Sequence, residues 1–368
     1  MHASDRPIEA VSQRLASFVT AQSDTWRSEG PEAAGFVDAG ADVLTGGKRL
    51  RARFCLAGWQ AVAETRDDDD DTPTDDVIAA AAALEIFHAA ALVHDDLIDN
   101  SDTRRGRPAA HRALEAAHRA AGWAGDATAF GRSGAILLGD LLVAWSDDLL
   151  EEGLARLGRR APERAAAARA VYALMRREVT VGQFLDIAEE AAFVTAPAGE
   201  HAERALRVAS LKSARYSVQH PLLLGAALAG ADDAQTAALS DFGHPLGLAF
   251  QLRDDVLGVF GDSAVTGKPS GDDLREGKRT VLVAYTREAL GDEARVAFDA
   301  LLGDATLDDA QIDGLQQTIR ETGALDRVER LISQCAAEAD AALQDAPLGE
   351  HATQWLRDLA FDATARTA

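Results

Sequence analysis

The chain has 368 residues, 47% of them hydrophobic and only 5% aromatic, so it is long enough to bury a sizeable core. Abundant alanine and leucine with 10 prolines favour helices over strands. The formal net charge of −23 argues against partners such as nucleic acid and anionic lipid. A protein this acidic needs local basic groups or metal ions wherever it binds an anionic ligand.

The sequence predicts a cytoplasmic protein without a transmembrane segment. Residues 1–10 carry charges and no apolar run, so no signal peptide is expected. The longest apolar stretch, Val77 to Val93, contains Glu85 and His88 and is typical of a buried helix. Cys55 and Cys335 fit no zinc or redox spacing and are expected to be reduced thiols.

Helical periodicity runs through nearly the whole chain and predicts an all-α fold. Helices are expected over residues 8–27, 50–64, 77–99, 135–157, 163–190, 201–229, 233–260, 279–302, 308–321, 324–345 and 349–360. Residues 100–133 are polar, with a short helical piece over 109–121. Their glycines at 122, 125, 131 and 134 indicate mobile connections, which places Gly122, Gly125, Gly131 and Gly134 between helices.

The domain organisation follows from what interrupts this pattern. Residues 66–76 form an acidic run with Pro73, which predicts a disordered surface loop. No Pro/Gly/Ser-rich linker divides the chain, and segments that carry chemistry lie in both halves. The sequence therefore predicts a single domain over residues 1–368.

Two aspartate clusters follow apolar helical stretches. Asp95, Asp96 and Asp99 form a DDxxD motif in which the first and last share a helix face. The second cluster is Asp254 and Asp255. Carboxylate oxygens are the ligands that Mg²⁺ prefers, and one such motif alone is a weak signal. Two of them could hold several Mg²⁺ ions against one diphosphate.

Basic residues accompany the aspartates and supply a second requirement of diphosphate chemistry. Arg104 and Arg105 follow the first cluster, and Lys268 and Lys278 follow the second. They could donate hydrogen bonds to a diphosphate whose other side is neutralised by metal. A further anion pocket is indicated by GGKRLR at 46–51, because free N–H groups at a helix start favour phosphate.

In these motifs the chain resembles the trans-polyprenyl diphosphate synthase family. The resemblance covers about residues 46–280 and rests on GGKRLR (46–51), LEIFHAAALVHDDLID (84–99), RRGRPAAH (104–111), GQFLD (182–186), LKSARY (211–216), FQLRDD (250–255) and TGKPSGDDLREGKRT (266–280). All four lysines of the chain fall within them. The resemblance implies a helical bundle around a central cavity, a homodimer, and a reaction between isopentenyl diphosphate and an allylic diphosphate.

The resemblance also implies a role for each matching residue. The isopentenyl diphosphate would be held by Lys48, Arg51, His88 and Arg105. Three Mg²⁺ ions would be held mainly by Asp95, Asp99 and Asp254, with support from Asp96 and Asp255. The allylic diphosphate would be held by Arg104, Lys212, Lys268 and Lys278, of which Lys212 and Lys268 also act in catalysis. Ser213 and Gln251 would stabilise the reacting cation, and Phe250 would pack against the prenyl chain.

Two positions depart from the family pattern. Gly258 stands where many members carry a third aspartate, so weaker metal support is expected there. Ser213 replaces the more usual threonine and keeps the hydroxyl group. From the residues alone, a histidine on an apolar helix such as His88 is more often an ordinary core residue, and its place two turns before Asp95 favours the functional role. His94 is expected to be structural.

The helix before Asp95 predicts the product length. Its small Ala90 and Ala91 leave the first level of a tunnel open, and Phe87 one turn deeper could form the floor. One helical turn rises about 5.4 Å, similar to one isoprene unit. This predicts geranylgeranyl diphosphate, C20, as the main product, with C15 or C25 and longer products as alternatives. Phe87 could also be an ordinary core residue.

Two other functions remain open from the sequence. A class I terpene cyclase shares the helical fold and a DDxxD motif, but it does not need a second diphosphate pocket. A regulatory subunit of a heteromeric synthase tends to lose the aspartate motifs, which this chain retains.

Overall fold

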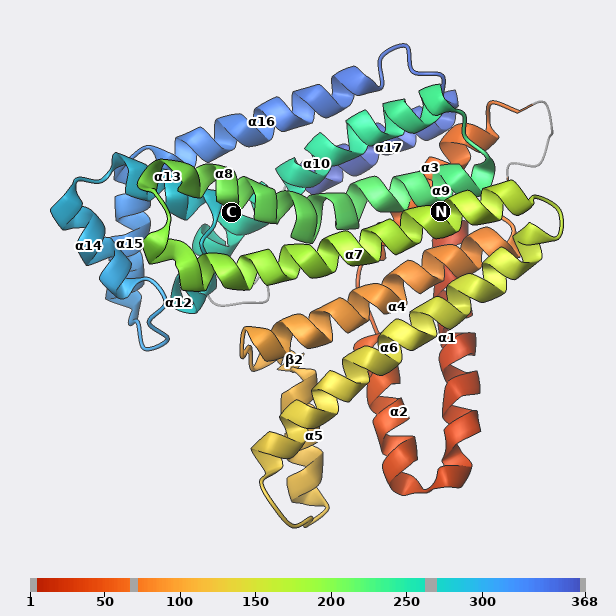
Figure 1. The fold of residues 1–368 in the computed structure, drawn as a ribbon, viewed down its shortest axis with the longest axis horizontal. Coiled ribbons are helices and arrows are strands. Elements are labelled where there is room, and N and C mark those ends of the chain that lie inside the picture. Colours follow the sequence, from red (N-terminus) through yellow and green to blue (C-terminus); the bar gives the residue numbers. More distant parts are fainter. Residues whose placement is uncertain (1–4, 67–71, 262–269, 365–368) are drawn as a thin grey trace. The chain divides into compact units, whose positions relative to one another are not determined.

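The computed structural model describes residues 5–66, 72–261 and 270–364 (Figure 1). Within these ranges the fold is all-α, as predicted, apart from one hairpin of two very short strands. The described residues form two compact units. Unit 1 contains the chain up to Arg169 and residues 225–230, and unit 2 contains residues 170–224 and 231 onward. The prediction of a single domain stays a prediction.

Unit 1 carries the first half of the chain. Its elements are α1 (Asp5–Trp26), η1 (Arg27–Glu29), α2 (Pro31–Val43), α3 (Leu50–Ala63), α4 (Asp75–Ile98), β1 (Thr103–Arg104), β2 (Arg107–Pro108), α5 (Ala110–Ala120) and α6 (Ala127–Gly158). Helix α4 packs along α6, and α1 and α3 also pack on α4 (Figure 1). The core of unit 1 therefore lies around α4.

The close pairing of α4 and α6 depends on small residues. Gly153 of α6 lies so close to the carbonyl oxygen of Asp76 that an added Cβ would be 2.8 Å from it. Further along, the hydroxyl of Ser146 donates to the carbonyl oxygen of Ala83 at 2.6 Å. By length and composition alone α4 and α6 could each span a bilayer, but 78% of the apolar window of α4 is buried within the fold. Helix α4 is thus a core helix.

The β-hairpin was not predicted, because two-residue strands leave no alternating pattern. Thr103 pairs with Pro108 and Arg104 pairs with Arg107. The two residues between them, Arg105 and Gly106, have positive φ angles of 53° and 72°. That combination forms a type I′ turn, the preferred connection in two-residue hairpins.

The prediction that Gly131 and Gly134 lie in mobile connections is wrong. Helix α6 begins at Ala127, eight residues before its predicted start, after the carboxylate of Asp126 caps its first N–H groups. A Cβ at Gly131 would lie 2.3 Å from the carbonyl oxygen of His111, and one at Gly134 would lie 2.9 Å from Leu114. These glycines are therefore sites where α5 packs closely against α6.

Unit 2 carries most of the second half. Its elements are α7 (Pro162–Ala192, beginning in unit 1), η2 (Phe193–Thr195), η3 (Ala198–Glu200), α8 (His201–Val208), the π-helix η4 (Ala209–Gln219), α9 (His220–Ala229, ending in unit 1), α10 (Asp233–Phe260), α12 (Asp272–Glu276), α13 (Val281–Ala289), α14 (Asp292–Leu301), α15 (Asp309–Glu321), α16 (Ala324–Ala342) and α17 (Glu350–Thr364). Helix α10 packs on both η4 and α16.

The core of unit 2 gathers apolar side chains of α10, α13, α15 and α16. Its central members include Leu252, Val256 and Ile319, which are 0–2% exposed. Helix α10 starts with a capping box between Asp232 and Gln235. These features fix the helix that carries the second aspartate cluster.

The remaining differences from the predicted helices have local causes. The segment predicted as one helix over 201–229 changes winding to a π-helix at Ala209 and back at His220. The predicted helix 279–302 is two helices, because Leu290 is extended at the end of α13. Asp75 and Asp76 of the predicted acidic loop belong to the first turn of α4. Residues 67–71 of that loop lie outside the described residues.

Candidate active site

The loop before α3 has a left-handed backbone at three of its residues. Gly46 and Gly47 have φ angles of 74° and 89°, and Arg49 is also left-handed at 52°. Lys48 is exposed, whereas Arg51 is buried at 9% exposure. Because the loop ends at the start of α3, the N–H groups of its first turn lie next to these cations.

Four of the predicted basic groups come together around this loop. The guanidinium of Arg105 lies against the loop, since a Cβ on Gly47 would be 3.0 Å from its Nη1. Desolvation and the charges of Arg51, Arg105 and Arg104 hold the pKa of His88 well below its usual range. His88 is therefore neutral at pH 7. It lies near Arg51 and Arg105, with which it was predicted to act, and also near Arg104, which was predicted to bind the allylic diphosphate.

Glu85 is a residue of this region that the motifs did not single out. Its side chain is 5% exposed, and its Oε1 accepts a hydrogen bond from the backbone N–H of Ala52 at 3.0 Å. Its Oε2 lies 3.9 Å from Nη1 of Arg49. The sequence signal that could have found Glu85 is a charged residue inside an apolar helical stretch.

The first aspartate cluster lies at the end of α4. Asp99 is the C-terminal capping residue, and its N–H donates to the carbonyl oxygen of Asp95 at 2.8 Å. Asp96 is 3% exposed and accepts hydrogen bonds from Nε of Arg104 at 2.8 Å and from its Nη2. Nη2 of Arg104 also lies 3.6 Å from Asp95. In this structure Arg104 thus contacts the carboxylates that it was predicted to act beside.

The second cluster lies on α10 in unit 2. The amide of Gln251 donates to Oδ1 of Asp255 at 2.7 Å, so one predicted site residue holds another. Desolvation and the neighbouring charge of Asp273 raise the pKa of Asp255 to about 7. Asp273, on α12, was not predicted. It lies in the segment GDDLREGK, and its carboxylate lies against Gly258.

An ion pair between Lys212 on η4 and Asp186 on α7 links these two helices. Nζ of Lys212 lies 2.5 Å from Oδ2 of Asp186. The two helices approach closely at Gly182, where a Cβ would be 2.4 Å from the backbone nitrogen of Lys212. Ser213 follows Lys212 in the π-helical winding, which is frequent at functional sites. Nε2 of Gln183 is buried and finds no hydrogen-bond partner in the described part of the chain.

Lys278 lies in the same part of unit 2. Its Nζ is 2.8 Å from Glu276 and 3.4 Å from Asp273. Desolvation and the charge of Asp186 raise the pKa of Glu190, and the charges of Lys212 and Lys278 act in the opposite direction. Both predicted lysines are therefore near one carboxylate on α7. Lys268 lies outside the described residues.

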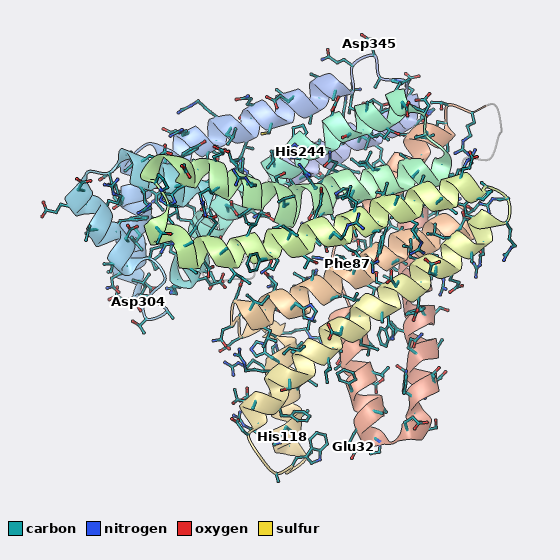
Figure 2. The ribbon with its side chains drawn as sticks, viewed as in Figure 1. Glu32, Phe87, His118, His244, Asp304 and Asp345 are labelled. Carbon is teal, nitrogen blue, oxygen red and sulfur yellow. The ribbon has the colours of Figure 1, made fainter. Side chains whose placement is uncertain are left out.

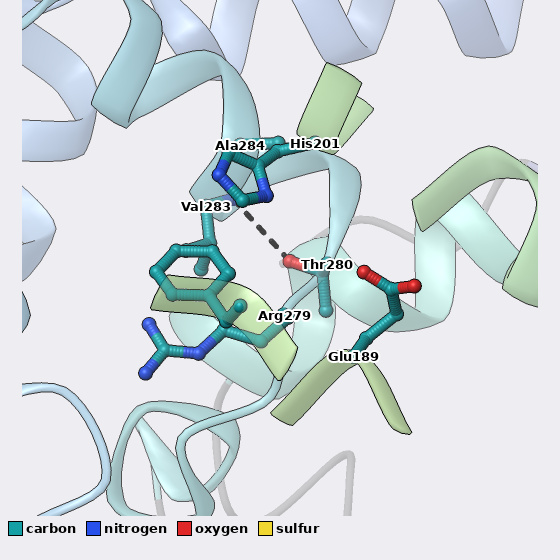
Figure 3. Close-up of a pocket in the computed structure, with 7 residues that line it drawn as sticks. Glu189, His201, Arg279, Thr280, Val283 and Ala284 are labelled. Carbon is teal, nitrogen blue, oxygen red and sulfur yellow. Dashed lines mark hydrogen bonds between the residues drawn. The ribbon is translucent and has the colours of Figure 1, made fainter. Parts of the chain in front are cut away.

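A small pocket borders the residue after Lys278 (Figure 3). It is lined by Glu189, Phe193, His201, Arg279, Thr280, Val283 and Ala284. The guanidinium groups of Arg279 and Arg287 each lie 3.9 Å from the ring centre of Phe193. Thr280 caps α13 by accepting from the N–H of Val283 at 3.4 Å. This packing anchors the chain on the C-terminal side of Lys278.

Among the described residues, no three His, Cys, Asp or Glu side chains are gathered closely enough to hold a metal ion. The chemistry of the second cluster nevertheless fits a hard divalent cation. Asp255 is buried beside Asp273 and Asp254, and both of these charges raise its pKa. Carboxylates in such an arrangement are stabilised when a cation compensates their charge.

The residues predicted to set product length lie on α4. Phe87, labelled in Figure 2, is 6% exposed. Ala90 is fully buried, and Ala91 is half-buried. Further on, the His94 ring lies against α6: a Cβ at Gly139 would be 2.0 Å from its Nε2. His94 thus packs against a neighbouring helix, in keeping with the structural role expected for it.

A family model described as polyprenyl synthetase matches residues 36–319 of the chain. The chain belongs to the polyprenyl synthetase family. It is 32% identical over 344 residues to the geranylgeranyl diphosphate synthase of Mycobacterium tuberculosis, covering 93% of this chain and 85% of that one. It is also 32% identical to the geranylgeranyl diphosphate synthase of Methanosarcina mazei, covering 78% of this chain and 76% of that one.

A solved structure of another family member has the same fold. The geranylgeranyl pyrophosphate synthase of Corynebacterium glutamicum, complexed with isoprenyl diphosphate and magnesium, matches with a TM-score of 0.90 and 40% identity. The match covers 100% of both chains. The basic and acidic groups described above therefore lie on the fold that this chain shares with the solved family member.

Proposed function

We propose that the chain is a Mg²⁺-dependent prenyltransferase that joins isopentenyl diphosphate to allylic diphosphates. The observation that supports it most is that each unit carries its own pairing of cations with an aspartate cluster. In unit 1, Arg104 contacts Asp95 and Asp96. In unit 2, Lys278 is among the charges that act on Asp255. A reaction between two diphosphates needs cations that bind the substrates and carboxylates that hold Mg²⁺, and both kinds of group are present.

The residues of unit 1 would bind the isopentenyl diphosphate. Lys48, Arg51 and Arg105 would supply positive charge, and the start of α3 would supply backbone N–H groups. His88 would act as a neutral imidazole, because its lowered pKa keeps it uncharged at pH 7. A neutral ring can donate one hydrogen bond to the diphosphate without adding to the charge of the arginines.

The residues of unit 2 would bind the allylic diphosphate. Lys212, Lys268 and Lys278 would hold its oxygens, and Asp186 orients the ammonium group of Lys212. The bond between the allylic carbon and the diphosphate oxygen would break, the isopentenyl double bond would attack that carbon, and the departed diphosphate would take the proton that the condensed cation then loses. Bound Mg²⁺, which we propose as three ions, would neutralise the departing diphosphate.

Ser213 and Gln251 would stabilise the positive charge that develops on the allylic carbon. The amide nitrogen of Gln251 is engaged with Asp255, which fixes its side chain. The hydroxyl of Ser213 and the carbonyl oxygen of Gln251 are the oxygen atoms these side chains offer to a cation. Water must be excluded around them, because it would capture the cation.

We propose geranylgeranyl diphosphate, C20, as the main product. The floor would be Phe87 on α4, with Ala90 and Ala91 leaving room above it. The names of the similar proteins from Mycobacterium tuberculosis and Methanosarcina mazei support this length.

We also propose a cytoplasmic homodimer. Apolar side chains lie exposed between the end of α5 and the first half of α6. They are Trp123 (42%), Phe130 (39%), Ile136 (50%) and Leu137 (61%). Large exposed apolar side chains grouped along one region are typical of an interface. A Leu137→Glu variant should be a monomer when its mass is measured by light scattering, whereas the unchanged protein should be a dimer.

Product analysis tests the proposed reaction. The purified chain would be incubated with Mg²⁺, labelled isopentenyl diphosphate and each of dimethylallyl, geranyl and farnesyl diphosphate. The products would be dephosphorylated and sized. We expect a Mg²⁺-dependent ladder that ends at C20. No incorporation with any of the three starters would contradict the proposal.

A further inference from the structure

Glu85 is a carboxylate in the middle of α4 that has no part in the reaction proposed above. Its side chain is 5% exposed. A carboxylate at this depth is unfavourable unless hydrogen bonds and cations compensate it. Its surroundings supply both, and both come from the loop that begins α3.

The first contact is a helix cap supplied from another helix. Ala52 is the third residue of α3, so its N–H belongs to the first turn and has no partner within the helix. The residue at the N-cap position, Arg49, makes no capping hydrogen bond with its side chain. Oε1 of Glu85 accepts this N–H at 3.0 Å. A negative charge at this end of a helix is also favoured by the helix dipole.

The second contact concerns a strained residue. Arg49 is left-handed, with φ at 52° and ψ at 43°, a conformation that disfavours side chains other than glycine. Its Nη2 donates to the carbonyl oxygen of Leu44 at 2.9 Å, and its Nη1 lies 3.9 Å from Oε2 of Glu85. One oxygen of Glu85 thus accepts a hydrogen bond from the backbone of α3, and the other attracts the guanidinium group of Arg49.

We propose that Glu85 is a positioning residue for the isopentenyl diphosphate pocket. The proposal rests on the function proposed above. Glu85 and His88 are three residues apart and share a face of α4. By capping α3, Glu85 fixes Lys48 and Arg51 relative to His88. Its charge also acts on Arg105, whose pKa it raises against the effect of burial.

Two substitutions separate the hydrogen bond from the charge. Glu85→Ala removes both, while Glu85→Gln keeps an oxygen that can accept the N–H of Ala52. We expect the KM for isopentenyl diphosphate to rise about tenfold or more in Glu85→Ala and about threefold or less in Glu85→Gln. The KM for the allylic diphosphate should change by less than about twofold in both, because Glu85 contacts Ala52 and Arg49 and none of the predicted allylic ligands in the described part of the chain.

Calorimetric binding of isopentenyl diphosphate alone gives a second readout that needs no turnover. Its dissociation constant should rise by the same factors as the KM. Asp76→Asn is the matched control: Asp76 is also a buried carboxylate on α4, 3% exposed, and Arg160 donates to it at 2.9 and 3.0 Å. This variant should unfold at a lower temperature and bind isopentenyl diphosphate normally.

The outcomes are distinct. A folded Glu85→Ala protein that binds isopentenyl diphosphate like the unchanged enzyme overturns the positioning role, as does an equal rise of both KM values. A Glu85→Gln protein as impaired as Glu85→Ala contradicts the cap. If Glu85→Ala does not fold, Glu85→Asp, which withdraws the carboxylate by one methylene, should show the same selective rise. Failure of the unchanged protein to bind isopentenyl diphosphate would instead contradict the proposed function.

Discussion

The carboxylate of Asp273 occupies the space that a side chain at position 258 would need. A Cβ built on Gly258 would lie 2.0 Å from Oδ2 of Asp273. By the resemblance described above, Gly258 stands where a third aspartate is expected, and in this structure a carboxylate from α12 lies there instead. We propose that Asp273 offsets in part the weaker metal support expected from Gly258.

This relationship predicts that restoring the aspartate is harmful. Gly258→Asp should lower the free energy of unfolding by about 1–3 kcal/mol, because it overpacks the contact with Asp273. The paired change Gly258→Asp with Asp273→Gly should recover most of that loss. Denaturant unfolding measures both. Gly314→Ala is the control: it lies in α15 with nothing within 4 Å of an added Cβ, and it should be neutral or stabilising.

The raised pKa of Asp255 predicts pH-dependent binding of Mg²⁺. In the folded protein this carboxyl titrates at about 7, against an ordinary value of 3.8, so between these values the folded state binds more protons. The stability that this group contributes to the metal-free protein is therefore present at low pH and lost as the pH rises through 7. Mg²⁺ prefers the ionised form and must displace the proton.

Mg²⁺ affinity should consequently rise about tenfold between pH 6 and pH 8 if a single group with a pKa near 7 controls it. Calorimetry in buffers of different ionisation enthalpy counts the protons released at pH 6. Asp255→Asn should bind Mg²⁺ more weakly and with little dependence on pH. An unchanged pH dependence in that variant would show that another group is responsible.

Product length should respond to substitutions on α4 in opposite directions. Phe87→Ala should lengthen the main product beyond C20, because it removes the proposed floor. Ala91→Phe should shorten the product, because a ring one turn nearer the aspartates blocks the first level. Sizing the dephosphorylated alcohols measures both. A C20 product from folded Phe87→Ala enzyme would make Phe87 an ordinary core residue.

The stacking on Phe193 predicts a stability effect beyond that of size. Phe193 is 4% exposed, with Arg279 and Arg287 at its ring. Phe193→Leu should lower the free energy of unfolding by about 1–2 kcal/mol more than a Phe→Leu substitution at a purely apolar site does. The reason is that desolvated cation–π contacts are lost. Phe242→Leu is a suitable control, since Phe242 is fully buried and no guanidinium stacks on it in the described part of the chain. If Phe193→Leu and Phe242→Leu lose equal amounts of stability, the stacking contributes no measurable stability.

Helix content and the helices that carry the two aspartate clusters could be predicted because their signals are local. The period of apolar residues placed α4 and α10 and put an aspartate cluster on each. GGKRLR indicated the loop before α3 because glycines and cations adjoin in the sequence. His88 and Arg105 were predicted for the same pocket by resemblance, and the structure brings both near Arg51.

The rest depended on contacts between residues distant in the sequence. Gly131 looks like a loop residue until the carbonyl oxygen of His111 is found against it. Glu85 caps a helix that begins 35 residues earlier, and no spacing rule connects the two segments. Asp273 reaches Gly258 from another helix. Each feature that the sequence periodicity and motifs did not predict therefore depends on tertiary packing.

The π-helical winding of η4 affects how relatives should be compared with this chain. Each turn closed by an i→i+5 hydrogen bond contains one residue more than an α-helical turn would. A relative that gained or lost one residue here could change its winding and keep the same backbone path. Aligned sequences would then be offset by one position around Lys212 and Ser213. Equivalent residues in this stretch are better matched by superposed structures than by counting letters.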